Sequence, residues 1–174
     1  MISRLTYRSR QFWNALLSPY TRVPSEILLA VLTPTQIVLF RRLQPAEQTH
    51  AHSIFKHLQA EGNSTADLLA AALLHDVGKI LHPLSIFDRV LIVVGKRLFP
   101  HKSARWAEGP AHGLRLPFVV AERHAGWGAE LAAQAGASPQ TVELIRRHHE
   151  PRLANPGSPI EHLLAALQAA DGKN

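Results

Sequence analysis

The chain of 174 residues has 46% apolar residues and a mean hydropathy of -0.04, which predicts a globular domain and excludes a disordered chain. It contains no cysteine, so disulfides and thiolate metal sites are excluded, and any metal must be bound by histidine and carboxylate. A net charge of +6 favours anionic partners such as phosphoesters. Eleven histidines are many for this length.

Residues 1–24 are predicted to form a short basic helix, with Phe12, Trp13, Leu16 and Leu17 on the side opposite its arginines. This helix either packs on the domain or contacts anionic lipid as a peripheral anchor. Its apolar run is too short for a secretory signal, and no segment approaches the roughly 18 to 20 apolar residues of a membrane span. We expect a cytoplasmic protein, and the peripheral membrane contact stays open.

Residues 25–174 are predicted to form an all-helical (all-α) domain of about seven to nine helices, because strand alternation and hairpin signals are missing. A basic segment rich in glycine and proline, residues 95–117, is interpreted as an inserted loop, either a surface crossover or a lid that attracts anions. In chain order, the expected helices cover residues 25–32, 35–43, 46–60, 64–75, 84–98, 118–135, 139–150 and 160–170.

The stretch LLAAALLHDVGKI carries the strongest functional signal. Ser64 and Asp67 are predicted to cap its helix, and Gly78 suits the helix C-terminus. His75 continues the apolar stripe and should face the interior, next to Asp76. Burying a histidine and a carboxylate at a helix end costs free energy unless both side chains have partners, and a divalent cation is the usual partner. The alternative is a histidine that only contacts the last carbonyls of its helix.

Other histidines and an aspartate also end or line apolar helices. Val142, Ile145 and His149 fall at i, i+3 and i+7, which predicts that His149 lies on the buried face and His148 on an adjacent one. Neighbouring imidazoles on one turn can each serve a different metal of a pair. The whole candidate set is His52, His75, Asp76, His124, His148, His149 and Asp171.

The order of these motifs resembles the HD-domain superfamily of metal-dependent phosphohydrolases. HSIFKHL around His52 is similar to the first-ligand helix of that family, and HDVGK to its central motif. HAGWGAELAAQAG and IRRHHE resemble the two-metal branch that includes the HD-GYP cyclic-dinucleotide phosphodiesterases, and the likeness covers residues 46–171. The GYP motif itself is missing after HHE, so the specificity for cyclic di-GMP does not carry over. Gln48 stands where some relatives have a third-metal glutamate.

The resemblance implies an all-α HD-domain bundle and an enzyme that hydrolyses a nucleotide or related small phosphoester through a metal-activated water. The implied cofactor is one or two divalent ions, Fe or Mn, or alternatively Zn, Ni, Co or Mg. One ion would bind His52, His75, Asp76 and Asp171. The second would be bridged by Asp76 and bound by His124, His148 and His149.

The resemblance also implies roles around the metals. Asp76 and Lys79 would be the catalytic residues, and Lys79, Arg123 and Arg147 would bind substrate phosphate. His50 and His57 are interpreted as solvated or structural.

Two other functions compete with hydrolysis. One is a non-catalytic regulatory HD domain that binds a nucleotide without hydrolysing it, with a location at the membrane surface left open. The other is a membrane-surface or nucleic-acid binder that uses the basic N-terminus. Specific nucleic-acid binding is not expected, because the basic residues are not interleaved with stacking aromatic residues.

Overall fold

The structure, a computed structural model, describes residues 22–172, and every regular element among them is a helix. The predicted all-α fold is confirmed, with nine α-helices in this part of the chain. The helix expected over residues 1–24 lies almost wholly outside the described residues, so the structure does not test it. The α-helices are α2 (Ser25–Val31), α3 (Pro34–Arg41), α4 (Pro45–Ala60), α5 (Ala66–Leu74), α6 (Ile86–Leu98), α7 (Pro100–Ala107), α8 (Leu116–Gln134), α9 (Pro139–Arg147) and α10 (Pro159–Asp171), with the short 3-10 helices η1 (Val77–Leu81) and η2 (Gly113–Arg115).

Most helix starts follow the signals in the sequence. Proline stands in the first turn of six helices, where its missing N–H costs no hydrogen bond. The Ser138 side chain accepts a hydrogen bond from the backbone N of Thr141, so it caps α9 as predicted. Capping boxes begin at Thr33, Ser85 and Ser158.

The capping box predicted for α5 is wrong. The residue before this helix is Thr65, and neither it nor Ser64 caps the helix through its side chain. Asp67 instead accepts hydrogen bonds from the hydroxyl groups of Ser138 and Thr141, the latter at 3.1 Å. The carboxylate therefore joins α5 to the start of α9, a long-range contact that local spacing does not reveal.

The loop predicted over residues 95–117 is largely helical. Helix α6 continues through Gly95, and α7 follows directly as a second helix. A Cβ atom at Gly95 would lie 2.5 Å from the Phe118 ring, so the glycine lets α6 pack closely on α8. The Trp106 ring of α7 lies 5.0 Å from the same Phe118 ring. The two helices form an arm that packs on α8.

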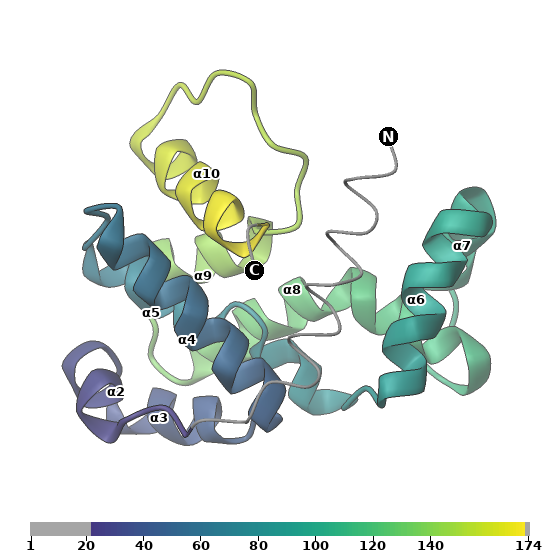
Figure 1. Ribbon diagram of the computed structural model, residues 1–174, viewed down its shortest axis with the longest axis horizontal. Helices are drawn as coiled ribbons and strands as arrows, with labels where there is room; N and C mark the ends of the chain where they lie inside the picture. The colour runs from purple at the N-terminus through teal and green to yellow at the C-terminus, as the bar shows by residue number, and fades with distance from the viewer. Residues whose placement is uncertain (1–21, 173–174) are drawn as a thin grey trace.

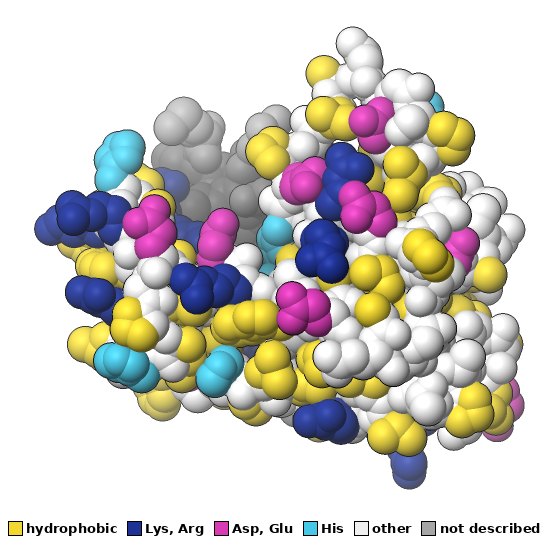
Figure 2. All heavy atoms as spheres, turned by 180° about the vertical axis from the view of Figure 1, so that it is seen from behind, with side chains coloured by type: hydrophobic (Ala, Val, Ile, Leu, Met, Phe, Trp, Pro, Cys, Tyr) yellow, Lys and Arg dark blue, Asp and Glu magenta, His cyan; other side chains and the backbone are white. Residues whose placement is uncertain are grey.

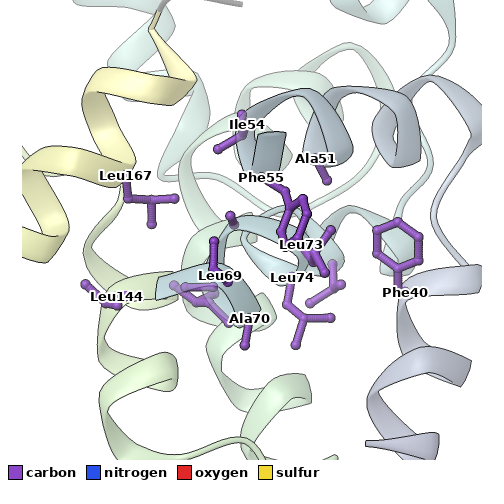
Figure 3. Packing of buried hydrophobic residues seen from close by; sticks show 14 of the residues in the cluster. Phe40, Ala51, Ile54, Phe55, Leu69, Ala70, Leu73, Leu74, Leu144 and Leu167 are labelled. Carbon is purple, nitrogen blue, oxygen red and sulfur yellow. The ribbon is translucent and has the colours of Figure 1, made fainter. Parts of the chain in front are cut away.

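Helix α5 is the centre of the hydrophobic core. All seven residues from Leu68 to Leu74 are buried, and α5 packs against α2, α3, α4, α9 and α10. Figure 3 shows Leu73 and Leu74 of α5 beside Phe55 of α4, with Leu144 of α9 and Leu167 of α10 nearby. Because this helix is covered on all sides, the residues at its C-terminal end are also buried.

The arm of α6 and α7 lies at one end of the molecule, and α2 and α3 lie at the other (Figure 1). Helix α8 connects the two regions, since it packs against η1 and α9 on one side and against α6 and α7 on the other. Within residues 22–172, no helix combines the length and the hydrophobicity that crossing a bilayer requires.

Candidate metal centre

The end of α5 places His75 and Asp76 inside the molecule. His75 follows the last residue of α5, and Asp76 precedes the 3-10 helix η1. Their exposed fractions are only 1% and 3%. The prediction that His75 faces the interior is therefore confirmed, and both polar side chains need partners in a region that water does not reach.

Gly78 serves this site in another way than predicted. Its φ angle is not positive, so it is not the left-handed glycine that ends many helices. A Cβ atom at this position would lie 2.0 Å from the carbonyl oxygen of His124 and 2.7 Å from the backbone N of Gly128. The two glycines let the backbone of η1 approach that of α8, and this brings His124 beside Asp76.

Three buried histidines share one arrangement. The Nδ1 atom of His75 lies 2.9 Å from the Ala72 carbonyl oxygen, and that of His148 lies 2.7 Å from the oxygen of Ile145. His124 Nδ1 lies 2.8 Å from the carbonyl oxygen of its own preceding turn. A carbonyl can only accept, so Nδ1 carries the hydrogen in each ring. The Nε2 atom of the neutral ring then presents a lone pair, as a metal ligand does.

Asp76 lies between the histidines. Its Oδ1 is 3.3 Å from His124 Nε2, and its Oδ2 is 3.5 Å from His75 Nε2 and 2.6 Å from Lys79 Nζ. Burial alone would raise the pKa of Asp76, but the Lys79 ammonium and the two imidazoles hold it well below the usual value. The carboxylate is ionised at neutral pH, and its two oxygens face different histidines.

His148 and His149 extend the cluster at the end of α9. The faces predicted for them are reversed, because α9 ends at Arg147: His148 is buried and His149 is exposed. The His149 Nε2 atom nevertheless reaches His124 Nε2 at 3.1 Å. Because His124 Nε2 bears a lone pair, a proton on His149 or a shared cation is needed between these atoms.

The histidine of α4 that the structure places beside His75 is His50, which sequence reasoning interprets as solvated or structural, and the ligand role of His52 stays a prediction. His50 Nε2 lies 3.0 Å from Asp171 Oδ1, and its ring centroid lies 5.5 Å from that of His75. The His52 ring instead stacks on Phe55, with 6.3 Å between centroids. The helical period places Glu47, His50 and Ile54 at i, i+3 and i+7 on one side of α4, whereas His52 lies on another side, where its Nε2 atom is buried without a hydrogen-bond partner among the described residues.

Asp171, the last residue of α10, contacts the cluster through His50, and its role as a ligand stays a prediction. Burial would raise the pKa of Asp171, but its hydrogen bond with His50 and the charge of His75 lower it. Two groups of potential ligand atoms result, each within 4.8 Å of one another: one is His50, His75 and Asp76, the other is His124, His148 and His149.

These residues fit divalent cations. The Nε2 atom of His148 is buried and has no hydrogen-bond partner among the described residues. Burial is the main cause that holds the pKa of His148 well below its usual value, and protonation of the neighbouring His75 or His149 would lower it further. Burial and the neighbouring His124 lower the pKa of His149 to about 4. The rings are thus neutral at pH 7, and a buried lone pair without a partner costs about 1 to 3 kcal/mol, which a cation would offset.

The predicted phosphate-binding residues lie in different surroundings. The Lys79 ammonium contacts Asp76 at the edge of the cluster. Arg123 is exposed, and its guanidinium donates to the carbonyl oxygen of Glu108 at 3.0 Å. Arg147 is paired with Glu150 at 2.9 Å on the surface of α9. The structure brings Lys79 to the cluster and engages both arginines elsewhere.

Sequence reasoning missed two residues that support the cluster, Glu47 and Gln168. Glu47 is buried one turn before His50 and accepts a hydrogen bond of 2.9 Å from Arg89, so it fixes α4 against α6. Burial is the main cause that raises the pKa of Glu47. Gln168 donates to the carbonyl oxygens of His148 and Glu150 at 3.3 and 2.9 Å, and so holds the turn after α9. The stripe that contains His50 would have identified Glu47; Gln168 gave no local signal.

A comparison with known protein families agrees with this geometry. The model of the HD domain matches residues 48–172 of the chain. The chain belongs to the HD-domain family. The curated proteins and the solved structures give no match to this chain. HD domains are metal-dependent phosphohydrolases as a superfamily and bind divalent metals, and the matched range contains the whole histidine and aspartate cluster.

Proposed function

We propose that this HD domain hydrolyses a small phosphoester, a nucleotide or a chemically related compound, with divalent cations held by the histidine and aspartate cluster. One observation carries the proposal: three buried imidazoles have Nδ1 bonded to backbone carbonyls and Nε2 turned toward an ionised Asp76 or its neighbours. The net charge of +6 supports an anionic substrate. The absence of cysteine supports a reducing compartment such as the cytoplasm.

The cluster divides into two places for cations. The first would be held by His50, His75, Asp76 and Asp171. The second would be held by Asp76 with His124, His148 and His149. Asp76 belongs to both, because its two oxygens face different histidines. Iron or manganese suits this donor set of imidazole and carboxylate, and zinc, nickel, cobalt or magnesium are alternatives.

Divalent cations at such a site supply positive charge to the phosphoester and lower the pKa of water to near neutrality. The chain's own residues then have three roles. The backbone hydrogen bonds of His75, His124 and His148 fix the ring orientations before anything binds, which lowers the cost of assembling the site. Asp76 remains ionised because Lys79 lies beside it. No serine or cysteine nucleophile is required.

Lys79 is the residue we propose for contact with substrate phosphate. Its side chain is one-fifth exposed, and the ammonium lies at the edge of the cluster beside Asp76. The flexible stem of a lysine lets its charge move by several ångströms, so Lys79 can reach a phosphate oxygen that approaches the cluster. The contacts of Arg123 and Arg147 do not support the same role for these two residues.

The test measures hydrolysis of bis-p-nitrophenyl phosphate and of a nucleotide panel by the full chain with Mn²⁺ or Fe²⁺. We expect activity in the wild type and its loss in Asp76→Ala. His57→Ala is the matched control, since His57 lies on α4 but pairs with Glu61 away from the cluster. This control should keep full activity.

Equal activity of Asp76→Ala and wild type would reject the proposed site. Tight nucleotide binding without turnover under every metal condition would favour the regulatory HD domain instead. Metal content per chain, measured by elemental analysis on the same samples, shows whether the cluster was loaded when turnover was measured.

A further inference from the structure

The arm of α6 and α7 carries an apolar face that no described residue covers. Ile86, Val90, Val93 and Val94 fall at i, i+4, i+7 and i+8, so they form one stripe along α6. All four are exposed, although the opposite side of the same helix packs on α8 through Gly95. Gly95 is the one buried residue of α6, so the apolar stripe is not the side that packs on the domain.

The apolar side chains on this side of α6 are strongly exposed to solvent. Phe87 is 85% exposed, Leu98 63% and Val93 57%. Exposed apolar side chains that occur singly need no explanation, but a continuous row along one helix marks a contact surface. We call the six exposed apolar residues together the outer face of α6: Ile86, Phe87, Val90, Val93, Val94 and Leu98.

Positive charge borders the outer face. Lys96 and Arg97 lie at its C-terminal end, and Lys102 and Arg105 follow on α7. All four are exposed, and none has an ion-pair partner within the described part of the chain. The one carboxylate of α6, Asp88, is already bonded to Ser85 in the capping box. Figure 2 shows this end of the molecule from behind, where dark blue and yellow side chains lie close together with some magenta and cyan ones.

We propose that the outer face of α6 docks on a membrane surface that contains anionic lipid. Amphipathic helices that lie in the interface have this pattern, with apolar side chains among the acyl chains and lysine or arginine at the headgroups. The arm lies at one end of the molecule, so a flat surface can reach it (Figure 1). This contact uses other residues than the N-terminal helix considered from the sequence.

Electrostatic repulsion disfavours two other candidates for binding to this face, namely a second copy of the chain and the N-terminal segment of the same chain. A second copy placed face to face would bring Lys96, Arg97 and their α7 neighbours against the same residues. The N-terminal 25 residues of this chain contain four arginines and no carboxylate, so they repel the arm as well. An anionic bilayer offers both an apolar interior and a negative surface, and therefore matches the face in both respects.

The experiment is flotation of the full chain with vesicles of phosphatidylcholine, with or without about one third phosphatidylglycerol. We expect the wild type to bind the anionic vesicles and to be released by salt. Phe87→Ser with Val93→Ser should lower the partition coefficient by about tenfold or more, because two apolar side chains no longer enter the interface. Lys96→Glu with Arg97→Glu should abolish the preference for anionic lipid.

The matched control is Leu29→Ser with Val38→Ser. These residues are 67% and 66% exposed on α2 and α3, at the other end of the molecule, so the control removes similar apolar surface. It should bind like the wild type. Because all the substituted residues are exposed, circular dichroism and thermal unfolding should show the same fold in every variant.

Several results would overturn the proposal. These are wild-type protein that floats with neither vesicle, a Phe87→Ser and Val93→Ser variant that binds normally, and a control that loses binding equally. Loss of binding in Phe12→Ser with Trp13→Ser alone would assign the contact to the N-terminus. Sedimentation equilibrium tests for a dimer. If the wild type is a dimer and the variant Phe87→Ser with Val93→Ser is a monomer, the outer face of α6 binds a second copy of the chain instead.

Discussion

The close approach of η1 and α8 at Gly78 predicts that alanine at this position damages both stability and the metal centre. The added Cβ atom would lie 2.0 Å from the His124 carbonyl oxygen, whereas real Cβ contacts are essentially never shorter than 3.0 Å. The two backbones must therefore separate by about 1 Å. Neither side can yield by a simple rotation, since the atoms that clash with the new Cβ belong to the main chain of α8.

The size of the effect follows from this geometry. Overpacking of a buried site costs about 1 to 3 kcal/mol when side chains can adjust, so a clash with main-chain atoms should reach the upper part of that range. The movement also shifts His124 relative to Asp76, which are now 3.3 Å apart through Nε2 and Oδ1. We expect Gly78→Ala to lower the free energy of unfolding by about 3 kcal/mol and to reduce retained metal.

Urea denaturation followed by circular dichroism measures the first effect, and elemental analysis measures the second. Gly126→Ala is the control, because it lies in α8 near the same contact and its Cβ would meet no atom within 4 Å. In the interior of a helix this change should stabilise by up to about 1 kcal/mol. Equal stability of the two variants would refute the reasoning that the backbones meet at Gly78.

Three further predictions concern the cluster and its supports. His50→Ala should lower the metal retained per chain by about tenfold or more, whereas His52→Ala should leave it unchanged. Elemental analysis measures both, and loss of metal in His52→Ala alone would assign the ligand role to His52. Gln168→Leu keeps the volume but leaves two carbonyl oxygens unbonded, so urea denaturation should show a loss of about 1 to 3 kcal/mol, and an unchanged midpoint would contradict the role of this amide. Metal-free protein should lose stability as the pH falls from about 6.5 toward 4, because burial lowers the pKa of His149 in the folded state and the unfolded chain therefore takes up the proton first. His149→Asn should reduce that slope by up to about 1.4 kcal/mol per pH unit, and the same slope in both proteins would argue against a neutral His149.

The sequence predicted the helices and most of the cluster because both depend on short-range patterns. Proline at helix starts and apolar spacing gave the all-α fold, and motif order indicated His75, Asp76, His124 and Asp171. The geometry brings all four together, although metal binding itself stays a prediction. Spacing along α4 did not single out His50, which lies beside Asp171 and His75, and the ligand role of His52 stays a prediction.

Long-range contacts explain the remaining errors. Asp67 has a capping position in the sequence, yet it bonds to hydroxyl groups more than 70 residues away. Gly78 has the place of a helix-ending glycine, yet it is needed for the approach of another backbone. The segment after Gly95 has the glycine, proline and basic residues of a loop, yet Pro100 stands in the first turn of α7 and Trp106 packs on the distant Phe118. In each case the decisive partner is distant in sequence.

The sequence allows two interpretations of His75. It can be a helix-end histidine that contacts the last carbonyls, or it can be a metal ligand. The structure shows that one ring can serve both, since Nδ1 bonds to the carbonyl three residues earlier while Nε2 lies beside the Asp76 carboxylate, where a cation would sit. His148 has the same geometry at the end of α9. Asp171 ends α10, so three helix C-termini, each with partial negative charge, meet at one cluster. The carbonyl dipoles of these helix ends and the two carboxylates together favour positive charge there, which is the physical reason to expect cations where these helices end.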